Sequence, residues 1–202
     1  MRLLVGLSAL ILLDSIGVPV CAQPATEQLS ICLSCHGENG TSQAEHVPSL
    51  GAQKSDYVVA QLLMFREKQR IAPPMNDMAA NLSDDDLQSL AEAISKLPAP
   101  ETSAPIEAKA AEEARALIAR YRCGSCHGAD LAGQGQIPRV AGQREDYLTA
   151  ALEGYKSNAR PGYEPAMNEV SRDIKDEHIP VLARYLAQYR SEQSTAGQVP
   201  KP

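Results

Sequence analysis

Aromatic side chains are scarce in this chain of 202 residues, which has no Trp, one Phe and seven Tyr. The length allows for two small domains, and small domains of this composition have little apolar bulk for a core of their own. No strand-like alternation of apolar and polar residues is evident. The net charge is −6 and basic residues form no stripe, which argues against nucleic acid as a partner.

Cysteine is also limited, and its placement excludes a disulfide framework. Four of the five Cys residues lie in two copies of Cys-x-x-Cys-His, CLSCH at residues 32–36 and CGSCH at residues 123–127. The fifth, Cys21, lies in the N-terminal segment. No pair therefore remains for a structural disulfide.

The spacing of the pentapeptide has a chemical reason. Two thiols three residues apart can add to the two vinyl groups of one porphyrin, and the adjacent His can give its imidazole to the iron. In an exported protein the motif indicates c-type haem, so two copies predict two covalently bound haem c groups. A zinc site would need more Cys or His nearby, and a thioredoxin-like pair does not need the His. The predicted thioether residues are Cys32, Cys35, Cys123 and Cys126, and the predicted iron ligands are His36 and His127.

The N-terminal segment, residues 1–22, predicts a signal peptide and hence a periplasmic protein. Arg2 supplies a thin positive region, and residues 3–13 are an apolar run of about 11 residues. This run is too short for a permanent membrane-spanning helix, and no other segment is long and apolar enough. A lipid-modified Cys21 is the alternative. Export agrees with the haem motifs, because c-type haem is attached outside the bacterial cytoplasm.

The two halves of the sequence repeat each other. PSLGAQKSDY at residues 48–57 matches PRVAGQREDY at residues 138–147 at an offset of 90. The haem motifs are offset by 91, so only small loop changes separate the copies. The repeat predicts tandem domains of one fold.

A segment rich in Pro and Ala separates the repeats and is typical of a semi-extended linker. The C-terminal segment is polar and is predicted to be disordered. The predicted organisation is a signal peptide at residues 1–22, a first domain at 23–98, a linker at 99–105, a second domain at 106–190 and a tail at 191–202.

Both halves predict an all-α fold. Apolar residues recur at helical spacing over residues 56–68 and 147–156. Ser83 followed by three Asp residues is typical of a helix N-terminus. Residues 109–121 predict a helix before the second haem motif, and residues 176–189 predict one with an irregular first turn, because a Pro lies near its start. The stripe expected to be buried behind Ser83 is Leu87, Leu90, Ala91 and Ile94.

Methionine is the candidate for the second axial position of each iron. Thioether sulfur is a soft ligand, and His/Met ligation raises the potential of haem. Met167 is the single Met of the second half, and Met75 occupies the matching repeat position at an offset of 92. Met78 is the nearest competitor of Met75, whereas Met64 falls within a predicted helix and is expected in the core. Filling a core gap is the alternative role of Met75 and Met167, but we expect both in Pro-containing loops.

These residues carry a resemblance to the dihaem cytochrome c4 family, in which two class I cytochrome c domains lie in tandem. The matching elements span roughly residues 26–190. They are the two haem motifs, each followed by Gly, the repeated segments at 48–57 and 138–147, and each candidate Met with Leu or Ile seven residues later.

The resemblance implies roles for specific residues. His36 and His127 would be proximal ligands, and Met75 and Met167 distal ligands. A backbone carbonyl of each repeated Pro would orient the proximal His through its other ring nitrogen. These Pro residues, on the proximal side, are Pro48 and Pro138. Residues expected to line haem edges or propionates, with ordinary packing as the alternative, are Gln53, Gln143, Tyr57, Tyr147, Arg70 and Arg160.

The implied function is that of a periplasmic electron carrier rather than an enzyme, because iron with two protein ligands has no open position for substrate. Its partners would be respiratory-chain proteins such as a quinol-oxidising complex and a terminal oxidase. The main alternative is a dihaem subunit of a periplasmic dehydrogenase, such as a flavoprotein sulfide dehydrogenase. A catalytic peroxidase-like or thiosulfate-oxidising enzyme is a third hypothesis, and peripheral membrane association stays open.

Charge is distributed unevenly between the halves. Residues 23–100 carry five Lys and Arg against ten Asp and Glu, whereas residues 101–202 carry thirteen against fourteen. Such a dipolar protein can be oriented by its field during encounter with a partner. An ordinary solvated acidic surface is the alternative.

Overall fold

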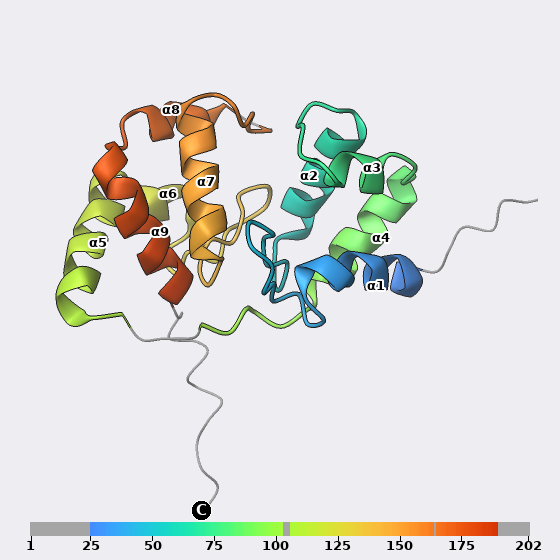
Figure 1. Cartoon of the computed structure of the whole chain (residues 1–202), viewed down its shortest axis with the longest axis horizontal. Helices are drawn as coiled ribbons and strands as arrows, with labels where there is room; N and C mark the ends of the chain where they lie inside the picture. Colours follow the sequence, from blue (N-terminus) through green and yellow to red (C-terminus); the bar gives the residue numbers. More distant parts are fainter. Residues whose placement is uncertain (1–24, 103–105, 164, 190–202) are drawn as a thin grey trace, which may run out of the picture.

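The computed structural model describes residues 25–102, 106–163 and 165–189, with helices throughout and no strand in these ranges (Figure 1). One isolated antiparallel bridge joins Gln134 and Ile137. The all-α prediction is confirmed. The predicted signal peptide, the tail at residues 191–202 and residues 103–105 of the predicted linker lie outside the described residues.

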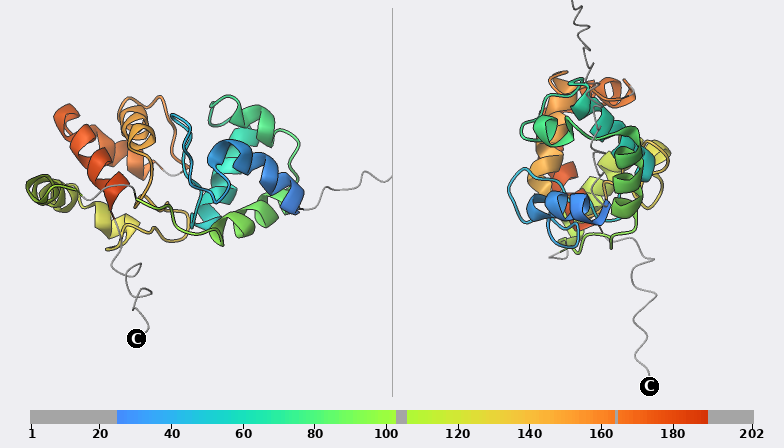
Figure 2. Two further views of the ribbon diagram at one scale, coloured as in Figure 1. Left: turned by 60° about the horizontal axis from the view of Figure 1, so that its bottom comes forward. Right: turned by 90° about the vertical axis from the view of Figure 1, so that its right-hand side faces the viewer.

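The described helices form two units that lie side by side (Figures 1 and 2). The first unit contains α1 (Ala25–His36), α2 (Ser55–Arg66), α3 (Met75–Ala79) and α4 (Asp84–Ser95). The second unit contains α5 (Ala108–Arg120), α6 (Cys123–His127), α7 (Glu145–Lys156), α8 (Ala166–Arg172), the 3-10 helix η1 (Asp176–His178) and α9 (Ile179–Gln188). None of the described helices is long and apolar enough to cross a membrane.

The core of the first unit forms where α4 packs against α1 and α2. Ser83 caps α4 as expected: its hydroxyl accepts from the backbone N–H of Asp86, and the Asp86 carboxylate accepts from the backbone N–H of Ser83. This capping box satisfies donors that the helix itself leaves free. The predicted stripe is buried, at 0 to 3 % exposure for Leu87, Leu90, Ala91 and Ile94.

In the second unit α9 packs against α5 and α7. Its first turn is irregular as predicted: η1 precedes it, and Pro180 lies at the start of α9, where the missing N–H costs no helical hydrogen bond. The two haem motifs differ in setting. The first is the end of α1, whereas the second forms the separate helix α6 because Arg122 before it adopts a left-handed conformation with φ 55°.

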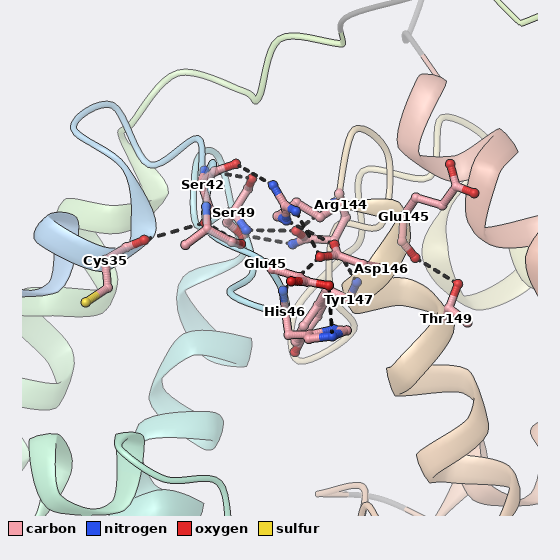
Figure 3. Close-up of polar contacts among 12 residues, drawn as sticks. Cys35, Ser42, Glu45, His46, Ser49, Arg144, Glu145, Asp146, Tyr147 and Thr149 are labelled. Carbon is pink, nitrogen blue, oxygen red and sulfur yellow. Dashed lines mark hydrogen bonds and ion pairs between the residues drawn. The ribbon is translucent and has the colours of Figure 1, made fainter.

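The centre of the contact between the two units is made by loops. The residues between α1 and α2 face those between α6 and α7 (Figures 1 and 3). The backbone N–H of Ser49 donates to Gln143 Oε1 at 2.8 Å, and the N–H of Arg139 donates to Gln53 Oε1 at 2.7 Å. Since each pair occupies corresponding repeat positions, the centre of this interface has approximate twofold symmetry.

In a second group of contacts across the interface, all the side chains come from the second unit. Arg144 Nη1 donates to the backbone oxygen of Ser42 at 3.2 Å, and the Asp146 carboxylate accepts from the backbone N–H of His46 at 2.8 Å (Figure 3). Arg144 also forms an ion pair with Asp146, whose side chain is 23 % exposed. Partial burial raises the pKa of Asp146, but Arg144 and the N–H groups of His46 and Tyr147 outweigh this and lower the pKa to about 2.

The low pKa of Asp146 predicts a pH-dependent contribution to stability. Because the pKa lies below its ordinary value of 3.8, the contribution is fully present above that value and is lost as the pH falls towards 2. We expect Asp146→Asn to lower the free energy of unfolding in urea at pH 6 and to have a much smaller effect at pH 2, where the carboxylate is about half protonated. Asp56→Asn, at the corresponding repeat position, is the control. An equal effect of Asp146→Asn at both pH values would contradict the prediction.

Candidate haem sites

The two motif histidines are buried and held in the same way. His36 is 6 % and His127 is 7 % exposed. Nδ1 of His36 lies 2.7 Å from the carbonyl oxygen of Pro48, and Nδ1 of His127 lies 2.8 Å from that of Pro138. A carbonyl can only accept, so Nδ1 carries the proton and Nε2 keeps a lone pair for a metal ion. Burial lowers the pKa of both imidazoles, and the bonds to the carbonyls offset part of this shift.

The cysteines lie beside these histidines on the same helical turn. In α1, Cys32, Cys35 and His36 are at positions i, i+3 and i+4, which share one face of a helix. The motif in α6 repeats this pattern. All four thiols are free, with Cys35 and Cys126 exposed and the other two half-buried. Burial raises the pKa of the Cys32 and Cys123 thiols.

The candidate methionines lie at the starts of two short helices. Met75 is the first residue of α3 and Met167 the second residue of α8, so the expectation that they sit in loops is wrong. The Pro residue before each helix suits a helix start, because Pro has no N–H and an N–H at this point would have no helical partner. Both side chains are half-buried, whereas Met78 is 46 % exposed and Met64 is a core residue at 3 % exposure.

Each candidate Met is followed by an Asn that fixes the helix start, a role that the sequence analysis missed. Asn76 Nδ2 donates to the carbonyls of Phe65 and Arg70. Asn168 Nδ2 donates to those of Tyr155 and Arg160, and its Oδ1 accepts from the N–H of Gly162. The sequence does contain a signal for this role, because the two Asn residues are 92 residues apart, the same offset that pairs the two methionines.

Arginines and tyrosines meet between the two units. Arg160 Nη2 donates to Tyr147 OH at 2.9 Å and to Tyr57 OH of the other unit at 3.3 Å. Arg70 Nη2 reaches Tyr147 OH across the interface at 3.4 Å. Burial raises the pKa of Tyr147, but the positive charges of Arg160 and Arg70 outweigh it and lower the pKa to about 8. Burial, reinforced by the neighbouring tyrosines, raises the pKa of Tyr57.

This cluster is suited to an anionic group. Arg160 Nε is buried without a hydrogen-bond partner, and in the described part of the chain neither Arg70 nor Arg160 is paired with a carboxylate. A buried polar atom of this kind calls for a partner. Porphyrin carboxylates would supply one.

The side chains present therefore fit two haem c groups. Each repeat offers two free thiols, an imidazole with Nε2 available and a half-buried thioether, and the interface offers guanidinium groups for carboxylates. A zinc site is less well supported, because the described residues contain no group of three or more His, Cys, Asp or Glu that could hold a metal ion. Gln53 and Gln143 bind backbone atoms across the interface, as described above.

Comparison with known proteins identifies the family. The cytochrome c family model matches residues 111–190. Cytochrome c4 of Thiocapsa roseopersicina is 30 % identical over 77 % of this chain and 85 % of its own length. This chain belongs to the cytochrome c4 family. A relative in Stutzerimonas stutzeri strain A1501, a thiosulfate dehydrogenase electron acceptor, is 31 % identical over 77 % of each chain.

A solved cytochrome c4 structure from Acidithiobacillus ferrooxidans confirms the fold. It aligns with a TM-score of 0.70 and 28 % identity, covering 79 % of this chain and 98 % of the solved one. This cytochrome c4 family member is therefore a dihaem electron carrier with two covalently bound haem c groups in class I cytochrome c folds. The predicted family, fold and cofactors are confirmed.

The role of Asn168 can be tested through stability. We expect Asn168→Ala to lower the free energy of unfolding of the haem-loaded protein by about 1 to 3 kcal/mol, because buried backbone groups lose their partners. Urea unfolding followed by circular dichroism measures this. Asn81→Ala, at an exposed turn position, is the control, and equal losses in the two variants would contradict the anchoring role.

Proposed function

We propose that this family member is a periplasmic carrier of single electrons, and not an enzyme, with one haem in residues 23–98 and one in residues 106–190. Haem c supplies a one-electron ferric/ferrous couple when bound. The proposed residues are Cys32 and Cys35 with His36 and Met75 for the first haem, and Cys123 and Cys126 with His127 and Met167 for the second. The observation that carries this proposal is the repeated bond from each buried His to the carbonyl of Pro48 or Pro138.

The chain's own residues support such a carrier in four ways. The bonds to the Pro carbonyls hold each His in one tautomer and one orientation, which leaves the lone pair of Nε2 available to iron. The Asn side chains that follow Met75 and Met167 hold those methionines at defined helix starts. Met75 and Met167, together with the two histidines, would fill both axial positions of each iron and leave none for substrate. Arg70 and Arg160 would offset the charge of haem carboxylates between the units.

We further propose export, with residues 1–22 as the signal peptide. Haem attachment outside the cytoplasm requires it, and the apolar run after Arg2 has the signal-peptide pattern. In the periplasm the carrier would exchange electrons with respiratory-chain proteins such as a quinol-oxidising complex and a terminal oxidase.

Optical spectra test the proposed ligands. We expect two haems per chain by pyridine haemochrome, a weak far-red Met-to-iron band and no shift on adding carbon monoxide. Met75→Ala and Met167→Ala should each remove about half of that band, while Met78→Ala should leave it intact. If Met78→Ala removes half of the band and Met75→Ala does not, Met75 is not the distal ligand of the first haem. Ready binding of carbon monoxide to the wild-type protein would support a catalytic role instead.

A dehydrogenase partner is the second candidate function. It is favoured by the relative described as a thiosulfate dehydrogenase electron acceptor. In this function the chain would accept electrons from a periplasmic dehydrogenase rather than from a quinol-oxidising complex. The haem chemistry and the ligands would be the same, so only partner kinetics can separate the two functions.

Reduction rates distinguish these partners. The oxidised protein is mixed either with thiosulfate and a purified thiosulfate dehydrogenase or with quinol and membranes from the host, and haem reduction is followed optically. Faster reduction by the dehydrogenase supports the second function, and faster reduction by membranes supports the first. Because encounter of charged proteins is steered by their fields, the faster reaction should slow as ionic strength rises.

A further inference from the structure

One peptide group lies between each motif histidine and the opposite unit. The carbonyl of Pro48 accepts from His36 Nδ1 at 2.7 Å, and the N–H of the same peptide group, which belongs to Ser49, donates to Gln143 Oε1 at 2.8 Å. His36 is thus connected, through a single peptide group, to a glutamine of the other unit.

The second histidine has the mirror arrangement. His127 Nδ1 donates to the carbonyl of Pro138 at 2.8 Å, and the N–H of that peptide group, from Arg139, donates to Gln53 Oε1 at 2.7 Å. Ser49 and Arg139 correspond in the repeat, as do Gln53 and Gln143. Two crossed hydrogen-bond chains therefore run through the interface.

Both glutamines are held in a single orientation. Gln53 is 6 % and Gln143 is 7 % exposed. Oε1 of each also accepts from the N–H of the next residue in its own unit, at 3.0 Å for Gln53 and 2.9 Å for Gln143. Nε2 of Gln143 donates to the Ser49 carbonyl at 2.8 Å, and Nε2 of Gln53 donates to the Arg139 carbonyl at 3.1 Å. A flipped amide would place donors against donors, so the acceptor must face the peptide N–H.

We propose that each glutamine is a positioning residue for the haem of the opposite unit: Gln143 acts on the haem held by His36, and Gln53 on the haem held by His127. This inference rests on the proposed function, because it takes the two histidines as iron ligands. Its physical basis is that hydrogen bonds in a chain polarise one another. Accepting from the peptide N–H makes the carbonyl of the same peptide a stronger acceptor for the histidine.

The direction of the effect follows from this polarisation. A stronger bond at Nδ1 makes Nε2 more electron-rich, and second-shell bonds of this kind raise the basicity of a ligand. A more basic ligand favours ferric over ferrous iron and lowers the reduction potential. Removing one glutamine therefore raises the potential of the haem in the other unit. Because each glutamine reaches its peptide group only when the two units are docked, docking contributes to the reduction potentials of both haems.

The test uses the full-length, haem-loaded protein and the near-isosteric variants Gln143→Met and Gln53→Met. In Gln143→Met we expect the equilibrium constant for reducing the His36 haem to rise about three- to tenfold, which is about 30 to 60 mV for a one-electron couple. The Nδ1 proton of His36 in the reduced protein should move upfield in the NMR spectrum, while that of His127 stays in place. Gln53→Met should give the reverse pattern.

Two controls separate this effect from a loosened interface. Asp146→Ala removes the hydrogen bond to His46 across the interface without touching either peptide chain, and it should leave both histidine protons in place. Gln143→Glu keeps an acceptor oxygen for the Ser49 N–H and makes it a charged one, so its His36 proton should move downfield rather than upfield. If Gln143→Met does not fold, the position of the His36 proton in Gln143→Glu is the test of the hydrogen-bond chain.

Two results would overturn the inference. In one, Gln143→Met shifts both histidine protons equally or only that of His127; in the other, it shifts neither. Failure of the proposed function is distinguishable, because it appears in the wild-type protein as missing haem or missing His/Met ligation. Failure of the inference appears only as a missing crossed effect in variants that bind both haems normally.

Discussion

The hydrogen bond from each buried histidine to a proline carbonyl is the constraint on which the rest of the structure depends. A buried imidazole needs a partner for its N–H, and the nearest loop provides one through Pro48 or Pro138. The bond fixes the tautomer and ties the loop to the motif helix. Because the same loops form the contact between the units, the geometry that prepares each histidine for iron also sets the shape of the interface.

The interface combines symmetric and asymmetric parts. The glutamine contacts and the Arg–Tyr contacts each occur twice in corresponding positions, as a repeat that pairs with itself would produce. Arg144 and Asp146 add bonds to Ser42 and His46 from the second unit only. Buried polar groups leave few alternative arrangements, because any shift would leave donors and acceptors unpaired. Hydrogen-bond geometry therefore specifies how the units dock, where a flat apolar contact would allow sliding.

Local features were predictable from the sequence because their causes are local. Ser83 with its following Asp residues marked a helix start, and the apolar spacing behind it marked the buried stripe. The haem motifs predicted the cofactor because thiol spacing reflects the chemistry of attachment. The helical setting of Met75 and Met167 was missed, since a short helix after Pro reads like a loop. The glutamine contacts were missed because their partners are backbone atoms 86 to 94 residues away.

The glutamines bond to backbone atoms of the opposite unit, which explains why the residues that supply these atoms are not alike in the two repeats. The residue that supplies the N–H is Ser49 in one unit and Arg139 in the other, two side chains with different size and charge. The peptide group is the same in both, so the side chain is free to differ and only Pro would remove the donor. Pro before it and Gln four residues after it recur in both copies. The repeated Pro and Gln are thus the visible part of an arrangement whose third member is the main chain itself.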